Sequence, residues 1–181
     1  IVRAALNDRR GRLQLLDRAV LLEDAQKLVR SVEYEFVTLD EVGRLVPVLA
    51  AMCPIPDAAA PGLADLMVNA IEHGNLGISY QEKSLLKLEG DWEAEIQRRM
   101  TLPQFTGRVA RVKAERVTDG VVFTISDQGA GFDWQKYLAF DPSRAFDPNG
   151  RGIAMAKLIS FSAIEYQGCG NVVVATVSTV S

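Results

Sequence analysis

The spacing of apolar residues changes along the chain, and each change marks a predicted element. Apolar residues recur at near-helical intervals over residues 12–32, with charges between them, which predicts a helix. Alternation of apolar and polar residues over residues 34–39 then predicts a strand. Asp40 is placed to cap a second helix, which runs through Leu49 and is stopped by Pro54. The first part of the chain is therefore predicted to form helix, strand and helix.

A third predicted helix has an apolar face and, on another side, a stripe of polar residues. Residues 58–61 are expected to form a loop before it, with Pro61 in its first turn and Gly74 at its end. Its apolar residues lie at spacings of three and four and would face a core; they are Leu63, Leu66, Met67, Ala70 and Ile71. A polar stripe at a spacing of four occupies another face and comprises Asp65, Asn69 and His73.

The next part of the chain is predicted to be a helical insertion followed by sheet. Residues 80–103 are charged and mostly helical in pattern, and they end near a proline. Apolar and polar residues then alternate, so residues 109–117 and 121–127 are predicted to form strands. The dipeptide Asp119-Gly120 between them is a strong hairpin signal.

The last predicted elements follow a long loop. Residues 132–150 contain prolines and glycines and are expected to form a loop with a helical turn, and loops of this length are uncommon unless they are functional. Residues 153–159 are a predicted helix, and residues 163–166 and 172–177 a predicted hairpin. These elements together predict an α/β (α+β) two-layer sandwich, with helices on one face of a mixed, largely antiparallel sheet.

The composition limits the classes of function. The 181 residues are 48% hydrophobic and carry a formal net charge of −3, which suits one globular domain. A weakly acidic chain lacks the positive field of non-specific nucleic-acid binding, so no nucleic-acid partner is expected. Cys53, Cys169 and His73 are too few for a structural zinc site or a disulfide framework, which favours a reducing cytoplasm. No stretch approaches the ~18 apolar residues of a membrane span, so no membrane partner is expected.

Residues 1–33 are expected to link the domain to another one. The chain begins at Ile1 without Met or a signal-like segment, so we expect a further domain on the N-terminal side. The helix over 12–32 suits a linker or a dimerisation helix, which would give a homodimer, and it equally suits a helix packed on its own domain. Residues 34–181 are expected to form the main domain.

Asp127 is the first candidate for chemistry. It follows a strand whose apolar face it shares, so its carboxylate is either buried with a partner or at the edge of a pocket. Gly129 and Gly131 follow it and allow the backbone to approach a flat ligand closely. A carboxylate in such a place can accept a hydrogen bond from the exocyclic amine of adenine. The same residues also suit an ordinary turn at the exit of a strand.

Asn69 is the second candidate. Asn is mildly unfavourable in the middle of a helix, and an oxygen ligand for Mg²⁺ would explain its presence. A solvent-exposed Asn is the plainer alternative. The lone histidine, His73, is compatible with packing or capping as well as with a site.

Gly150, Arg151 and Gly152 form the third candidate. They precede a predicted helix, so backbone N–H groups at its N-terminus could meet phosphate oxygens, and Arg151 could add charge. Glycine before a helix is also routine.

The order and types of these three segments resemble the N, G1 and G2 boxes of the GHKL, or Bergerat, ATP-binding fold. The boxes correspond to residues 65–75, 125–132 and 150–153, and the resemblance extends over about residues 34–180. The first box, Asp-Leu-x-x-Asn-Ala-x-x-His-Gly-Asn, looks most like the anti-sigma-factor serine/threonine kinase branch, which belongs to the histidine kinase-like ATPases.

The resemblance implies ATP and Mg²⁺ as cofactors and gives residues their roles. Asn69 would hold Mg²⁺, Asp127 would read adenine, and residues 133–149 would be the ATP lid. His73 matches a family position in the first box. The adenine end would be shaped by Gly129, Gly131 and Phe132. The phosphates would be bordered by Gly150, Arg151, Gly152 and Ile153.

One departure from the family concerns the catalytic base. The kinase branch usually has Glu four residues before the Mg²⁺-binding Asn, and this chain has Asp65 there. A general base must reach its proton at hydrogen-bond distance or through one water, and Asp is one methylene shorter. The shorter reach leaves nucleotide binding intact but puts phosphoryl transfer in question. Glu72 lies further along the same helix and is not assigned the role.

Three functions follow from the resemblance. The first is a bacterial signal-transduction serine/threonine kinase, which would phosphorylate a small anti-anti-sigma-like protein and be regulated by an N-terminal receiver domain of the response-regulator type. The second is a non-catalytic, nucleotide-sensing module that binds a sigma-like or anti-anti-sigma-like partner through an ordered lid. The third is the catalytic domain of a histidine kinase, which would need a phosphoacceptor His outside this chain.

Overall fold

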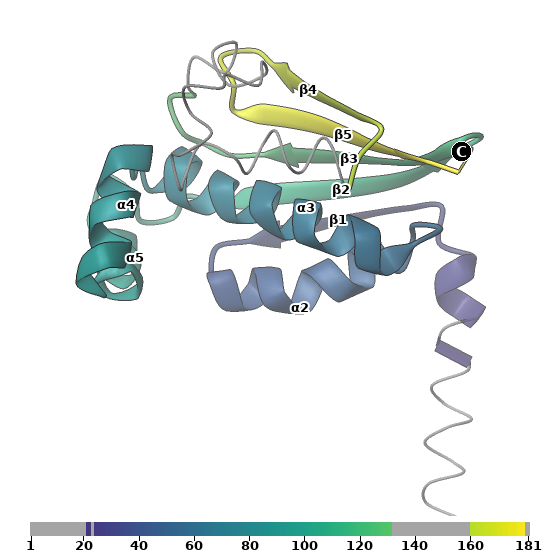
Figure 1. The fold of residues 1–181 in the computed structure, drawn as a ribbon, viewed down its shortest axis with the longest axis horizontal. Coiled ribbons are helices and arrows are strands. Elements are labelled where there is room, and N and C mark those ends of the chain that lie inside the picture. The colour runs from purple at the N-terminus through teal and green to yellow at the C-terminus, as the bar shows by residue number, and fades with distance from the viewer. Residues whose placement is uncertain (1–20, 23, 132–159, 180–181) are drawn as a thin grey trace, which may run out of the picture. The chain divides into compact units, whose positions relative to one another are not determined.

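The computed structural model of the chain describes residues 21–22, 24–131 and 160–179. It divides into two compact units, residues 1–30 and 31–181 (Figure 1). In the first unit the described residues begin as a helix and end as a turn before residue 30, and Lys27 pairs with Asp24 at 2.8 Å. The predicted helix over 12–32 is therefore wrong at its end, and residues 12–20 and 23 lie outside the described residues.

The described residues of the second unit form a five-stranded sheet in the order β1-β2-β3-β5-β4. Each pair of neighbouring strands is antiparallel. The strands are β1 (Ser31–Phe36), β2 (Ala110–Val117), β3 (Gly120–Ser126), β4 (Ala163–Gln167) and β5 (Val172–Ser178). The antiparallel pairing is confirmed, whereas the mixed character predicted for the sheet is absent from these described strands. Strand β1 begins and ends three residues before the predicted strand, and it ends early because Thr38 already caps the following helix.

The hairpin between β2 and β3 forms where the dipeptide Asp119-Gly120 predicts it. Its register places Val112 opposite Ile125 and Ala114 opposite Phe123, and all four side chains are buried. These residues alternate with exposed or half-buried positions, so one face of the hairpin enters the core.

Helix α2 (Leu39–Ala50) begins one residue before Asp40, which corrects the predicted cap. Thr38 is the N-cap: its hydroxyl accepts from the Glu41 N–H at 3.2 Å. The Glu41 carboxylate in turn accepts from the N–H groups of Val37 and Thr38, which lowers the pKa of Glu41. Asp40 is exposed and pairs with Arg44, so the reciprocal capping box explains the start of the helix.

Helix α3 (Pro56–Asn69) starts well before the predicted position. The loop expected over residues 58–61 is wrong: Pro56 occupies the first turn, where its missing N–H costs nothing, and Pro61 lies inside the helix. Gly74 does not end the helix either. The chain continues as a π-helical turn, η1 (Ala70–Asn75), closed by a hydrogen bond from Leu76 N–H to the Ile71 carbonyl at 2.9 Å.

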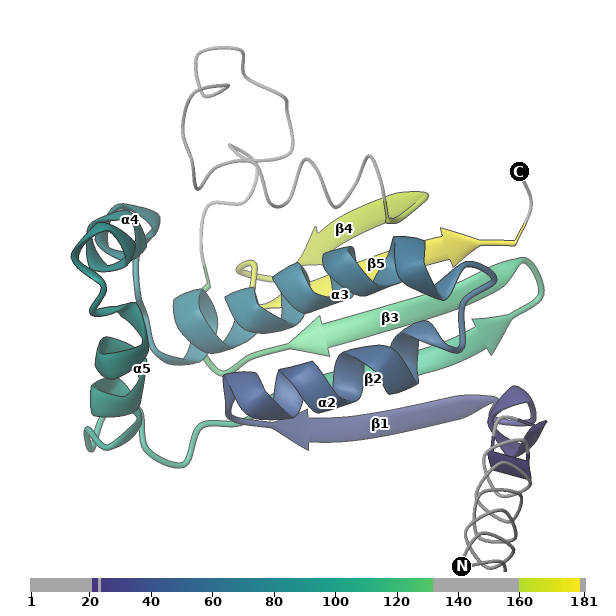
Figure 2. The same cartoon turned by 60° about the horizontal axis from the view of Figure 1, so that its bottom comes forward.

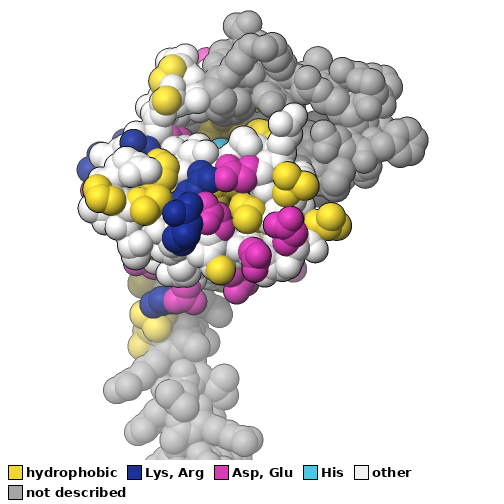
Figure 3. Space-filling view, turned by 90° about the vertical axis from the view of Figure 1, so that its left-hand side faces the viewer, with side chains coloured by type: hydrophobic (Ala, Val, Ile, Leu, Met, Phe, Trp, Pro, Cys, Tyr) yellow, Lys and Arg dark blue, Asp and Glu magenta, His cyan; other side chains and the backbone are white. Residues whose placement is uncertain are grey.

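The predicted helical insertion is confirmed as two short helices, α4 (Tyr80–Glu89) and α5 (Trp92–Met100). Gly90 separates them with φ of +81°, a left-handed conformation that favours glycine. Arg99 of α5 holds the insertion to η1, because its guanidinium donates to the Leu76 carbonyl at 3.0 Å and pairs with Glu82 and Glu95. On this side of the molecule, Lys and Arg side chains lie beside Asp and Glu side chains (Figure 3).

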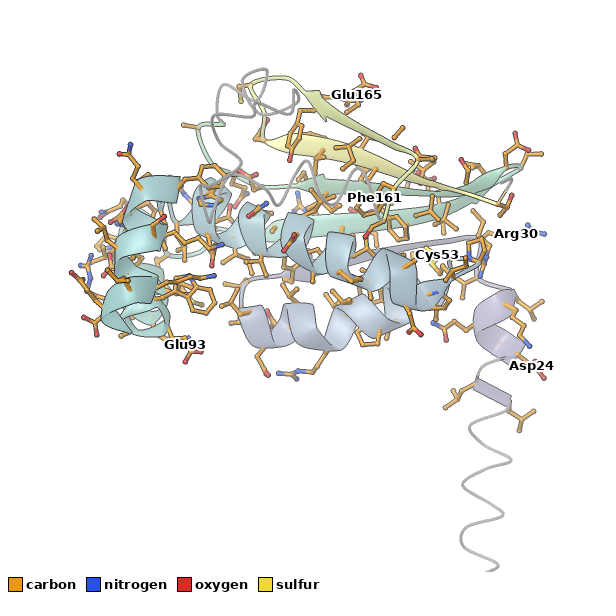
Figure 4. The ribbon with its side chains drawn as sticks, viewed as in Figure 1. Asp24, Arg30, Cys53, Glu93, Phe161 and Glu165 are labelled. Carbon is orange, nitrogen blue, oxygen red and sulfur yellow. The ribbon has the colours of Figure 1, made fainter. Side chains whose placement is uncertain are left out.

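The helices α2 and α3 lie across the same face of the sheet, which gives two layers (Figure 2). Glu165 on β4 points away from these helices, whereas Phe161 is buried just before the same strand (Figure 4). The core lies between the layers and includes Phe36, Leu49, Leu63, Met67 and Phe123. Among the helices of the described segments, none combines the length and apolar character needed to cross a membrane.

The close approach of α3 to residues 160 and 161, which lie just before β4, gives a test of the packing. A Cβ on Gly62 of α3 would lie 2.5 Å from Ser160 Cβ and 2.6 Å from a ring carbon of Phe161. We expect Gly62→Ala to lower the free energy of unfolding by about 1–3 kcal/mol because the core is overpacked. Urea unfolding would measure the change.

The matched control is Gly43→Ala on the exposed side of α2, where an added Cβ meets nothing within 4 Å. We expect that substitution to raise the free energy of unfolding by about 0.5–1 kcal/mol, because alanine is the better helix former. Equal effects of the two substitutions would contradict the packing described here.

Candidate functional site

A cavity of about 640 Å³ lies where the end of α3 and η1 meets the ends of β3, β4 and β5. Volumes of this order are typical of small-ligand sites. Four residues predicted from the sequence line it: Asn69, His73, Asp127 and Gly131. Gly129 does not line the cavity but adjoins it through Asp127. The structure therefore brings together residues that are up to 62 positions apart (69 and 131).

Asp127 is placed by the strand that precedes it. It continues the buried face of Val121, Phe123 and Ile125, and its N–H donates to the Asn171 carbonyl at 3.0 Å. Burial raises the pKa of Asp127 to about 6, although the Gly129 N–H, which donates to Oδ1 at 2.8 Å, and Arg108 both act to lower it. A half-buried carboxylate at a cavity wall is a candidate for reading a hydrogen-bond donor of a ligand.

Glycines allow the backbone to close around this carboxylate. A Cβ on Gly74 would lie 2.5 Å from both Asp127 oxygens, and a Cβ on Gly129 would overlap the Gly74 carbonyl oxygen. Gly131 has φ of +78°, and a Cβ there would lie 2.8 Å from the Cys169 sulfur. Side chains at these three positions would fill the space in which the helix end, the strand end and the β4–β5 turn meet.

Asn69 is the last residue of α3, is half-buried, and lines the cavity. Within residues 24–131 and 160–179, no group of three or more His, Cys, Asp and Glu side chains could hold a metal ion. A single amide oxygen fits a Mg²⁺ ion that is ligated mainly by phosphates and water, but not a metal held by protein alone.

His73 has one ring nitrogen engaged and the other buried. Its Nδ1 contacts the Ile78 carbonyl, which makes Nδ1 the protonated nitrogen and Nε2 the acceptor. Burial lowers the pKa of His73, and Nε2 has no hydrogen-bond partner among the described residues. The ring lies against Tyr80, with centroids 4.0 Å apart and planes at 34°. His73 is therefore a neutral wall residue whose conformation η1 and α4 fix together.

Asp65 lies apart from these residues. It is exposed and does not line the cavity, although it sits one helical turn before Asn69. The surrounding protein partly desolvates this exposed carboxyl, which raises the pKa of Asp65; Lys83 and Lys87 oppose that rise, and Glu72 adds to it. Glu72 itself is fully buried and pairs with Lys83 of α4. The structure leaves the role of Asp65 as base a prediction.

The end of the first glycine box, the second glycine box and the predicted lid fall in the part of the chain that the structure does not describe. Phe132, Gly150, Arg151, Gly152 and Ile153, and the predicted lid over residues 133–149, lie outside the described residues. The predicted helix over residues 153–159 lies there too.

Several cavity residues were missed from the sequence. Tyr80, Phe105 and Arg108 come from the insertion and the segment that follows it, and Tyr166 and Asn171 come from the closing hairpin. The alternation in β4 could have placed Tyr166 on the buried face, where burial raises its pKa. Nothing in the spacing of the insertion indicates that Arg108, whose guanidinium lies 5.3 Å from the Phe105 ring centre, faces the cavity.

Comparison with known proteins adds no relationship to these observations. No family model matches the chain, and no curated protein matches it. The geometry and chemistry of the cavity therefore have to support any proposal about its function.

The buried carboxylate predicts a dependence of stability on pH. The pKa of Asp127 is about 6 in the folded chain and about 3.9 in an unfolded one, so its ionisation favours unfolding. The stability associated with the neutral acid is present below about pH 4 and is lost as the pH rises through about 6. We therefore expect Asp127→Asn to raise the melting temperature at about pH 7.5 and to leave it nearly unchanged at about pH 4.

The control is Asp119→Asn at the exposed turn between β2 and β3, which also removes one carboxylate. Thermal unfolding of both variants at the two pH values would measure the effect. A gain for Asp127→Asn that is the same at both pH values, or that Asp119→Asn reproduces, would contradict the burial of Asp127.

Proposed function

We propose that residues 31–181 bind Mg·ATP in the cavity, as GHKL domains of the anti-sigma-factor kinase branch do. The observation that carries this proposal is the presence of the Asp127 carboxylate and the Asn69 amide on the wall of one cavity of about 640 Å³. Glycines at positions 74, 129 and 131 leave room for the backbone to approach that carboxylate. The residues present thus fit an adenine nucleotide, with its base near Asp127 and its phosphates toward Asn69.

Asp127 would favour adenine over guanine because its carboxylate is negatively charged. With a pKa of about 6, its carboxylate is ionised at neutral pH and accepts hydrogen bonds only. The exocyclic amine of adenine is a donor, whereas guanine presents a carbonyl oxygen at the same position, which the carboxylate would repel. Ile125 and Val173 line the same cavity and offer an apolar surface to the ring.

Asn69 would hold Mg²⁺ together with the phosphates. The ion would neutralise phosphate charge and orient the terminal phosphoryl group. Gly150, Arg151 and Gly152 are proposed to border the phosphates, and residues 133–149 to cover them, on the strength of the resemblance alone.

The activity that we propose for the complex is phosphoryl transfer to Ser or Thr of a partner protein. Asp65 would take the hydroxyl proton while the partner's oxygen attacks the terminal phosphorus and ADP leaves. Its raised pKa suits a proton acceptor, and its exposure leaves it accessible to a partner. The partner proposed is a small anti-anti-sigma-like protein.

A second candidate is a nucleotide-sensing module without phosphoryl transfer. The observation that favours it is the position of Asp65 outside the cavity wall, where Lys83 and Lys87 influence its pKa. In this case nucleotide binding would only change a surface presented to the partner. The histidine kinase alternative has less support, because the single His of the chain is the wall residue His73.

Thermal unfolding with nucleotides tests the binding proposal. A ligand at about 100 times its dissociation constant stabilises by about 2.7 kcal/mol, which for a domain of this size is roughly 5–10 °C. We expect such a rise with Mg·ATP and Mg·ADP, a smaller one with Mg·GTP, and loss of the preference for adenine in Asp127→Asn. No rise with any nucleotide at millimolar concentration would sink the proposal.

The metal role of Asn69 predicts a change in magnesium dependence. We expect Asn69→Ala to weaken ATP binding about tenfold or more when Mg²⁺ is present and to change it little in the presence of EDTA. Isothermal titration calorimetry with and without Mg²⁺ would measure both affinities, with Gln97→Ala on exposed α5 as the control. If the loss is the same with and without Mg²⁺, Asn69 does not hold the ion.

A further inference from the structure

Asn75 ends η1 with its side chain turned toward the end of β3. The residue is only 3% exposed, and its Oδ1 accepts a hydrogen bond from the Gln128 N–H at 2.8 Å. Gln128 directly follows Asp127. Asn75 is the last residue of the first box, where the resemblance gives it no role, and it does not line the cavity. The buried Asn75 side chain therefore holds the backbone of Gln128, the residue next to Asp127, which is proposed to contact the base.

Two more hydrogen bonds complete a closed circuit around this contact. Arg108 Nη1 donates to the Asn75 carbonyl at 2.9 Å, and the neighbouring Val109 N–H donates to Gln128 Oε1 at 2.9 Å. The circuit joins three segments that are distant in sequence: the end of η1, the entry to β2 and the exit of β3. Because the three hydrogen bonds hold the same three segments together, we expect the loss of one to loosen the others.

The π-helical turn explains why Asn75 can reach this position. Its wider hydrogen bond, from Leu76 N–H to the Ile71 carbonyl, adds a residue to the turn relative to an α-helix. Gly74 then packs on the Asp127 carboxyl while the next residue, Asn75, meets the Gln128 N–H. The same turn thus contacts both residues, one through its backbone and the other through a side chain.

We propose that Asn75 is a positioning residue that holds Asp127 in its half-buried place in the cavity and thereby sets the preference for adenine. The part about adenine rests on the proposed function, whereas the part about the position of Asp127 does not. Asn75 acts through Gln128 and does not touch the ligand. Arg108 assists by fixing the Asn75 carbonyl and by facing the cavity itself.

The test compares Asn75→Ala with Val46→Ala. Val46 is a buried residue of α2 that does not line the cavity, so its truncation destabilises the core without altering the circuit. Two readouts need no nucleotide: hydrogen exchange of the Gln128 amide, and NMR titration of the Asp127 carboxyl carbon.

In Asn75→Ala we expect the Gln128 amide to exchange about tenfold faster relative to amides in the sheet. We also expect the Asp127 titration midpoint to move from about 6 toward the ordinary value of a solvated carboxyl, since burial is the main cause of its displacement. Val46→Ala should change neither quantity. An unchanged midpoint and unchanged exchange in Asn75→Ala would overturn the proposal.

The nucleotide readout is the ratio of the dissociation constants for Mg·GTP and Mg·ATP. We expect this ratio to fall about tenfold in Asn75→Ala and to stay at the wild-type value in Val46→Ala. A wild-type ratio in Asn75→Ala would overturn the role in base selection even if the titration moves. If the wild-type protein binds no nucleotide but the titration moves as expected, the proposed function fails and the positioning of Asp127 by Asn75 is upheld.

Discussion

The contact between Gly74 and the Asp127 carboxyl is the constraint on which the site depends. The end of η1 and the end of β3 lie so close together that a Cβ atom at position 74 or 129 would overlap the opposite segment. Only glycine therefore fits at these two positions. Asp127 is half-buried there, and this burial raises its pKa to about 6. Gly74 and Asp127 together form part of the cavity wall. Burial of a carboxylate lowers stability, so its retention in this place is consistent with a role in binding.

Local patterns predicted most elements of the sheet and its helices. Asp119-Gly120 fixed the β2–β3 hairpin, and alternation gave β4 and β5 nearly to the residue. Helix boundaries were less predictable where two signals competed. Thr38 rather than Asp40 caps α2 because only Thr38 has Glu41 three residues later. Pro56 rather than Pro61 opens α3, since both prolines suit a first turn and the alanines between them favour helix.

The site was predicted only where a local sequence motif marks its residues. Asn69, His73, Asp127 and Gly131 were recognisable because each belongs to a short motif, and the structure brings them to one cavity. Arg108 and Tyr166 were not recognisable, and Asn75 was given no role although it ends the first box. Their roles arise from contacts across 30 residues or more, or from a π-helical turn that no local spacing signals. The insertion over residues 80–103 is charged and carries no motif, yet its Tyr80 lines the cavity. Arg99 of the same insertion donates a hydrogen bond to the Leu76 carbonyl, which directly follows η1.

In the proposed complex, the Asp127 carboxylate accepts a hydrogen bond from the exocyclic amine of adenine. The most direct measurement compares, by calorimetry at neutral pH, the affinity of the wild-type domain for Mg·ATP with its affinity for the magnesium complex of purine riboside triphosphate, which lacks only that amine. A hydrogen bond to a charged group contributes about 1.5–3 kcal/mol, so the analogue is expected to bind about 10–150-fold more weakly. Equal affinities for the two nucleotides would contradict the claim.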